Sequence, residues 1–224
     1  MKFVHPLLET PLELSENSVN VLVVENQKIF SNLITELLEQ KSGCEGEFVL
    51  SQELKELSIE KNTEVILEPF SLDLNNRRIL NRLYAKLSEI AVNEEFYLAY
   101  TGISARIFEF VEKLAQKAEN HLIYGESIDA ASLFKMVDLK LEIDHESLLE
   151  KIDDYMSVVQ EFLGISVFIF VNLKKFLTAE NLLELYQSSA YNKYSLLLFE
   201  NSIDEKILSG EKTYIIDKDL CSIY

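Results

Sequence analysis

Three basic side chains recur at every fourth position of one segment, and this is the clearest chemical pattern in the chain. If the segment is helical, Arg78, Arg82 and Lys86 lie along one side of the helix. The opposite side carries apolar residues that are expected to face a core, namely Leu80, Leu83, Tyr84, Leu87 and Ile90. A cationic stripe can bind the phosphates of a polyanion. Glu89 and Glu94 lie close by, so an ordinary solvated helix face fits the same pattern.

The charge of the remaining chain restricts where a polyanion could bind. The 224 residues include 21 Lys and Arg against 38 Asp and Glu, which gives a net charge of −17. All four arginines fall between Arg77 and Arg106. Residues 75–142 hold 9 basic and 10 acidic residues, whereas the other residues hold 12 and 28. An acidic surface repels nucleic acid and anionic membranes, so polyanion binding is expected on one face only.

No motif supports nucleotide hydrolysis or another catalytic activity. A phosphate cradle needs glycines that let backbone N–H groups approach the anion, but the turns after residues 20–25 and 166–172 contain none. The histidines are scattered, no nucleophile motif is present, and Cys44 and Cys221 have neither metal nor redox spacing. We therefore expect a protein that is not an enzyme and whose cysteines are reduced.

Carboxylates are abundant, so a hard cation is the metal class that the chain could hold. Glu119, Glu126 and Asp129 flank the turn at Gly125 between two expected helices, and Ca²⁺ takes carboxylate and carbonyl oxygens from such turns. The spacing is not that of an EF-hand, and exposed acids at helix ends are common. A calcium site and a set of ordinary solvated acids both fit the sequence.

Buried strands alternate with helices in both halves of the chain, which predicts an α/β fold with a mostly parallel sheet flanked by helices. The strand candidates are residues 20–25, 47–51, 65–69, 166–172, 195–200 and 213–217. Helices are expected between the first strand and Gly43, at 146–163, and after the N-cap candidate Thr178.

The stretch from residue 75 to about residue 137 has no strong strand signal. Its helical stretches are residues 75–92, 94–119 and 128–137. We therefore expect a discontinuous α/β head domain, 1–74 and 144–224, interrupted by an α-helical leg lobe at 75–143. No apolar run approaches a membrane span and the N-terminus lacks the apolar block of a signal peptide, so a cytoplasmic protein is expected.

Residues 21–43 resemble the opening of a response-regulator receiver domain, which has a strand, an acid and an amphipathic helix in this order. A receiver holds Mg²⁺ with an acidic pair after its first strand and accepts phosphate on an aspartate that ends a later strand. Here the pair is Glu25 and Asn26, and the later strand ends in Glu68. Lys174 could take the place of the receiver's lysine. A receiver-like signalling domain with a degenerate acidic pocket is therefore the alternative interpretation.

The joint order of several segments resembles the ring-forming accessory protein of CRISPR adaptation in type II-A systems, the Csn family, in its shorter form. The segments are residues 5–14, 21–34, 65–87, 133–142, 166–187, 195–200 and 214–219. The resemblance implies an α/β head, a helical leg and a homotetrameric ring that encircles the ends of double-stranded DNA. It also implies calcium in the leg and no catalytic activity. The implied role is acquisition of new spacers, with the adaptation integrase and the effector nuclease as partners.

The same resemblance makes the cations of the leg the candidates for DNA contact. They are Arg77, Arg78, Arg82 and Lys86, together with Lys135 and Lys140, which match lysines of a family segment. Relatives tend to carry lysines where this chain has residues 162–165, so no contact is expected there. Binding through these cations would address phosphates and read no sequence. A symmetric ring would multiply the few cations of each subunit.

Overall fold

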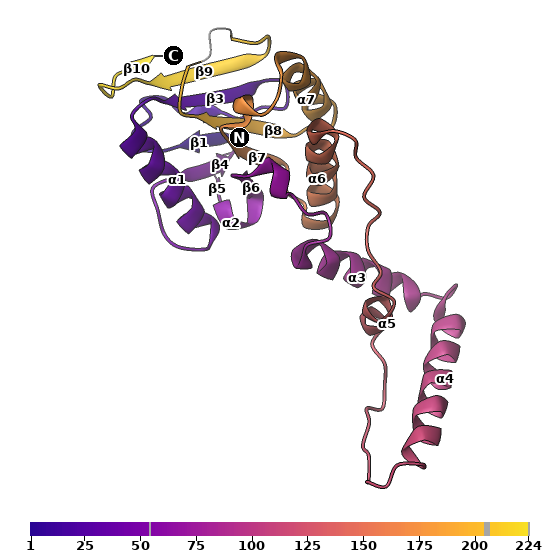
Figure 1. Ribbon diagram of the computed structural model, residues 1–224. Coiled ribbons are helices and arrows are strands. Elements are labelled where there is room, and N and C mark those ends of the chain that lie inside the picture. Colours follow the sequence, from indigo (N-terminus) through magenta and orange to yellow (C-terminus); the bar gives the residue numbers. More distant parts are fainter. Residues whose placement is uncertain (54, 204–206, 224) are drawn as a thin grey trace. The chain divides into compact units, whose positions relative to one another are not determined.

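The computed structural model describes residues 1–53, 55–203 and 207–223, and the chain forms two compact units (Figure 1). Unit 1 combines Met1–Asp73 with Asp144–Tyr224, and unit 2 is the intervening stretch Leu74–Ile143. The predicted fold class is confirmed. The chain forms a mostly parallel sheet flanked by helices, and a helical segment separates the two stretches of sequence that build this part.

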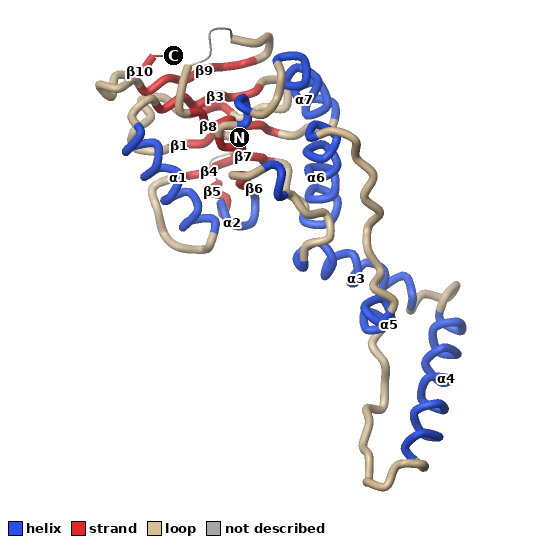
Figure 2. The backbone as a smooth tube through the Cα atoms, in the orientation of Figure 1, coloured by secondary structure: helices blue, strands red, loops and turns tan. Residues whose placement is uncertain are grey.

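Unit 1 is built on a six-stranded sheet with the order β10-β9-β3-β8-β7-β6 (Figure 2). The parallel strands are β3 (Val19–Val24), β6 (Thr63–Ile66), β7 (Val167–Val171), β8 (Ser195–Glu200) and β9 (Glu211–Ile216). The short β10 (Ser222–Ile223) is antiparallel to β9. Every residue of β3, β7 and β8 is buried, as expected for parallel strands that are covered on both faces.

Helices cover the two faces of this sheet. Figure 1 shows α1 (Gln27–Lys41) on one face and α6 (Leu148–Leu163) with α7 (Ala179–Tyr191) on the other. Leu33 and Leu37 of α1 enter the core with alternate residues of the strands. The predicted N-cap Thr178 is confirmed, because its side chain accepts the backbone N–H of Asn181 at 3.2 Å.

The strand predicted at residues 47–51 belongs to a second sheet. It forms β4 (Val49–Gln52), which pairs antiparallel with β1 (Lys2–Val4) and β5 (Lys55–Leu57), and β1 also pairs with β2 (Leu12–Glu13). Placing residues 47–51 in the parallel sheet was therefore wrong. Strands as short as β1 and β2 give no periodic signal, so the sequence did not reveal this sheet.

Three short helical segments complete the connections of unit 1. They are α2 (Ile59–Asn62) and the 3₁₀ turns η1 (Pro69–Ser71) and η2 (Leu173–Lys175). No helix in the described ranges is long and apolar enough to cross a membrane. Cys44 and Cys221 are both exposed, free thiols.

Unit 2 contains the helices α3 (Arg77–Ala91), α4 (Tyr97–Ala115) and α5 (Ala130–Met136), each slightly shorter than the predicted stretch. The Tyr84 ring of α3 lies 6.0 Å from the Phe134 ring of α5, and the Tyr84 hydroxyl donates to the carbonyl of Leu139 at 2.7 Å. Asn75 donates to the carbonyl of Leu141 and accepts its N–H. These contacts pack α3 against α5 and the segment that follows.

A partly buried carboxyl group lies between α6 and α7. Burial raises the pKa of Asp153; a hydrogen bond with Ser188 opposes this rise, and the charges of Glu184 and Asp154 add to it. One carboxylate oxygen of Asp153 is buried and has no hydrogen-bond partner among the described residues. The charged form of Asp153 is therefore costly in the folded protein.

Replacing Asp153 with Asn should raise the melting temperature near neutral pH, by about 2 °C. The pKa of Asp153 is higher in the folded than in the unfolded chain. The contribution of this carboxyl group to the stability of the wild type is therefore fully present below the pKa that the group has in the unfolded chain. It is lost as the pH rises through the folded pKa. The advantage of the variant should therefore shrink in acid. Thermal melts of both proteins from pH 4 to pH 8 test this, and an equal advantage at every pH would contradict it.

Candidate nucleic-acid interface

The cationic stripe of α3 lies on the solvent side of this helix. Asn76 caps the helix, because its side-chain oxygen accepts the N–H groups of Arg78 and Ile79 at 3.1 Å. Ile79 and Tyr84 are buried, so helical geometry directs positions 78, 82 and 86 away from α5. Arg78, Arg82 and Lys86 are all exposed, and so is Arg77, which lies off this line. The structure thus presents a row of three cations over two turns of one helix.

The other cationic candidates lie on α5, after it and on α4. Lys135 is exposed in the last turn of α5. The ammonium group of Lys140 lies 2.6 Å from a carboxylate oxygen of Asp138, so part of its charge is neutralised. Arg106 is exposed on α4. All of these residues belong to unit 2, together with the α3 stripe.

The net charge differs strongly between the two units. Unit 2 holds 9 basic and 10 acidic residues, whereas the rest of the chain holds 12 and 28. Phosphate approaching unit 1 therefore meets a large excess of negative charge, and phosphate approaching unit 2 does not. This difference favours unit 2 as the part of the chain that meets a polyanion.

The predicted calcium ligands do not form a prepared site in this conformation. The Asp129 carboxylate caps α5, where it accepts the N–H of Ala131 at 3.3 Å and lies 3.4 Å from the Ser132 hydroxyl. Among the described residues, one group of three metal-binding side chains comes within 4.8 Å of one another, and it does not include Glu119, Glu126 or Asp129. These three side chains therefore do not converge in this structure, and a calcium site formed by them stays a prediction.

The side chains that do converge are His5, Glu36 and Glu47 of unit 1. The His5 Nε2 atom lies 3.3 Å from Glu36 and 3.9 Å from Glu47. His5 Nδ1 accepts the N–H of Leu7 at 3.2 Å, so the proton of a neutral ring lies on Nε2 and is donated to Glu36. A metal-bound histidine normally donates its second ring N–H, which this arrangement forbids. The cluster is therefore a hydrogen-bonded support for the N-terminal strand.

The receiver-like alternative is wrong, because the strand order separates the residues that it needs. Glu25 follows β3 and Glu68 follows β6, but β8 and β7 lie between these strands. At about 4.8 Å per strand, the two positions are roughly 14 Å apart. The side chain of Lys174 is buried and is paired with Glu211 at 2.9 Å. The N-terminus of α1 is also a poor phosphate site. The Asn26 side chain already accepts the backbone N–H groups of Lys28 and Ile29, which a phosphate would need.

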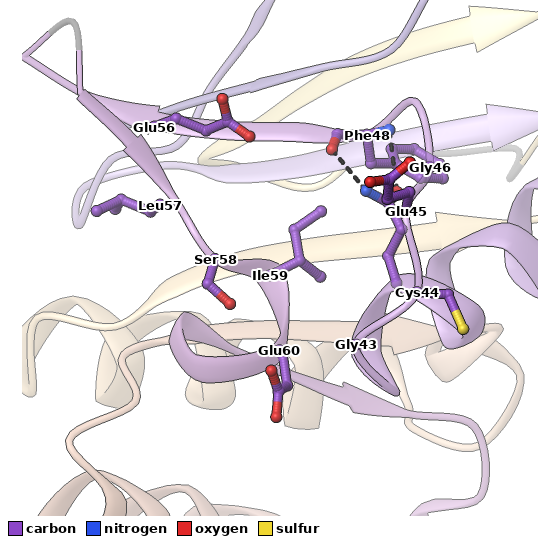
Figure 3. Close-up of a pocket in the computed structure, with 11 residues that line it drawn as sticks. Gly43, Cys44, Glu45, Gly46, Phe48, Glu56, Leu57, Ser58, Ile59 and Glu60 are labelled. Carbon is purple, nitrogen blue, oxygen red and sulfur yellow. Dashed lines mark hydrogen bonds between the residues drawn. The ribbon is translucent and has the colours of Figure 1, made fainter.

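A pocket of about 410 Å³ opens in unit 1 between the loop Gly43–Gly46 and the segment Glu56–Glu60 (Figure 3). Its walls carry Glu45, Glu56 and Glu60, and none of its lining residues is basic. The Gln40 amide closes one side through two hydrogen bonds with the backbone of Phe48, at 2.9 and 3.0 Å. This anionic pocket is unsuited to nucleic acid.

Comparison with known proteins identifies similar chains. The family model described as CRISPR-associated protein (Cas_Csn2) matches residues 40–220. A protein of Streptococcus agalactiae called CRISPR-associated protein Csn2 is 26% identical over 98% of this chain and 96% of its own length. A protein of the same name from Enterococcus faecalis is 22% identical over 97% of this chain and 96% of its own length. The crystal structure of Stu0660 of Streptococcus thermophilus has a similar fold, with a TM-score of 0.59 and 14% identity over 97% of this chain and 75% of that one.

Proposed function

Because this chain belongs to the Cas_Csn2 family of CRISPR-associated proteins, which takes part in CRISPR adaptation, we propose that it binds the ends of double-stranded DNA as a homotetrameric ring. In this role it supports the acquisition of new spacers, acts without catalysis and works with the adaptation integrase and the effector nuclease. The observation that carries the proposal is the exposed row Arg78, Arg82 and Lys86 in the less acidic unit.

The chemistry of this row suits phosphates and not bases. Guanidinium and ammonium groups on one helix face neutralise successive phosphates and release counterions, which makes binding sensitive to salt and independent of sequence. Arg77 and Lys135 are exposed in the same unit and extend the proposed contact area. Lys140 contributes less, because Asp138 already neutralises part of its charge.

Assembly from several copies is supported by the helix α4. None of its residues is buried, although the helix carries many apolar side chains. Phe110, Leu114 and Ile103 are more than half exposed. An apolar helix face without a cover is typical of a surface that another chain covers. Symmetry would then let the few cations of each subunit converge on one duplex.

Charge reversal of the α3 row should weaken binding to linear duplex DNA. We expect the variant Arg78→Glu, Arg82→Glu, Lys86→Glu to lose affinity by about tenfold or more. Its slope of log K against log salt should become shallower by about 2.7 for each subunit that contacts DNA, because each lost phosphate contact removes about 0.9. Fluorescence anisotropy over a salt series measures both quantities.

The matched control changes the net charge equally at three exposed lysines of unit 1, Lys28→Glu, Lys212→Glu and Lys218→Glu. This control should keep most of the affinity and the wild-type salt slope. If both variants lost affinity equally, the effect would come from overall charge and the α3 row would not be the contact. Both variants must retain their helicity and their mass in solution.

Calcium binding to unit 2 stays a prediction from the family resemblance. Calcium should raise the melting temperature, since a ligand that binds only the folded chain stabilises it, and a chelator should reverse the rise. The variant Glu119→Gln, Glu126→Gln, Asp129→Asn should lose this response while keeping the helix cap, because Asn caps as well as Asp does. If the variant responds like the wild type, the ions bind elsewhere, and if neither protein responds, the calcium prediction is wrong.

A further inference from the structure

The outer edge of β9 in unit 1 is only partly covered by another strand. β9 runs from Glu211 to Ile216, and β10 pairs with its last two residues (Figure 1). On the side toward β3, the carbonyls of Gly210 and Ile216 accept backbone N–H groups at 3.0 Å. Because the backbone groups of successive residues point to opposite sides of a strand, the even-numbered residues of β9 bond to β3 and the odd-numbered ones point outward.

Thr213 therefore presents its backbone N–H and C=O at this outer edge. The pairing with β10 ends where Ile215 meets Ile223, and within the described part of the chain β9 pairs with no strand other than β3 and β10. Glu211 donates its N–H to the carbonyl of Leu208 at 3.2 Å, while its own carbonyl points outward. The edge thus offers one donor and two acceptors at the spacing of an extended strand.

A hollow of about 370 Å³ lies beside this edge. Thr213 lines it together with Lys212 and Tyr214 of the same strand. Its other walls are Asn20 of β3 and residues 10–13 of the N-terminal segment. Side chains of a strand added to β9 would alternate between the two faces of the sheet, so one of them would enter this hollow.

The hollow contains a hydrogen-bond acceptor that the fold leaves unused. Asn20 is only 2% exposed, and its Nδ2 atom donates to the carbonyl of Glu13 at 3.1 Å. Because a carbonyl oxygen only accepts, the amide nitrogen must face Glu13 and the Oδ1 atom is directed elsewhere. No group among the described residues donates to this Oδ1 atom. A buried amide oxygen without a donor is costly, so a ligand in the hollow that donates to it gains affinity.

The charge around the hollow favours a cationic ligand. Glu13 lines the hollow and is exposed, and unit 1 carries almost all of the net charge of −17. The lining residues also include Lys212, but its side chain is exposed and its ammonium group can extend into solvent. A lysine or arginine side chain supplies both a donor for Asn20 and a positive charge beside Glu13.

We propose that the outer edge of β9 binds an extended segment of a basic partner protein, which adds a strand beside residues 211–213. The backbone of this segment exchanges hydrogen bonds with Thr213. One lysine or arginine side chain enters the hollow, donates to the Asn20 Oδ1 atom and pairs with Glu13. Backbone pairing then supplies affinity and the hollow supplies selectivity. The surface lies in unit 1 and is independent of the DNA contacts proposed for unit 2.

Other occupants fit this edge less well. Nucleic acid is repelled by the negative charge of unit 1, and a second copy of the chain would bring the same excess of carboxylates. A free polyamine can pair with Glu13 but cannot exchange backbone hydrogen bonds with Thr213. An extended basic segment satisfies the edge, the Asn20 oxygen and the charge together.

Two substitutions at one position of the full-length chain test the backbone pairing. Thr213→Pro removes the outward N–H and leaves the bonds to β3, which is how proline is accommodated in edge strands. The matched control Thr213→Val keeps this N–H and removes a hydroxyl that is buried without a partner. The probe is a dye-labelled pentapeptide amide with a central arginine flanked by valines, followed by fluorescence anisotropy. Thr213→Pro should weaken its binding by about tenfold, and Thr213→Val should leave the binding unchanged.

Changes in the peptide test the same contacts on the wild-type protein, whatever the folding of the proline variant. Methylation of the peptide's backbone nitrogens removes its donors and should abolish binding. Replacement of its arginine by norleucine should weaken binding to the wild type, and Glu13→Gln should weaken binding of the arginine peptide only.

Three results would overturn the β9 proposal. One is the absence of arginine-peptide binding to the wild type up to about 1 mM. Another is equal affinity of the wild type and a folded Thr213→Pro variant, because charge attraction alone would then explain the binding. The third is a lower solution mass of Thr213→Pro without peptide, because the edge would then join copies of the chain. None of these results bears on DNA binding, which is measured separately on the α3 row.

Discussion

The unequal distribution of charge between the two units is the constraint on which the account depends. Unit 1 carries almost all of the net charge of −17, and unit 2 is close to neutral. Phosphate and other copies of the chain are both repelled least at unit 2. The exposed row on α3 and the exposed apolar side chains of α4 both lie in this unit, so polyanion binding and assembly are proposed for the part of the chain where electrostatics opposes them least.

Two of the lysines of unit 1 are used inside the fold. The Lys174 side chain is 7% exposed and pairs at 2.9 Å with the Glu211 side chain, which is fully buried. The Tyr186 hydroxyl donates to the same carboxylate. Lys41 donates to the carbonyls of Glu60 and Thr63, at the edge of the sheet. A buried ion pair is retained because removal of one partner leaves an uncompensated charge. These cations hold segments of unit 1 together and are not presented to a polyanion.

Local periodicity predicted the features that depend on neighbouring residues. Strands such as residues 166–172 are continuous apolar runs, and the α3 row follows from a spacing of four. The features that the sequence did not reveal depend on pairing between distant residues. His5 meets Glu36 and Glu47 through the fold, and β1 pairs with β4 across more than forty residues. Glu119, Glu126 and Asp129 are close in sequence, yet their three side chains do not converge in the structure. The spacing of residues along the sequence does not predict such contacts between distant segments.

Binding to linear and to closed-circular duplexes of one sequence tests the central claim most directly. A ring that encircles DNA needs an end to thread, so the linear duplex should bind in a salt-dependent manner and the closed circle only weakly at the same salt concentration. Cutting the circle once should restore binding. Equal affinity for the closed and the cut molecule would contradict the account, because contacts along the side of a duplex would then explain all of the binding.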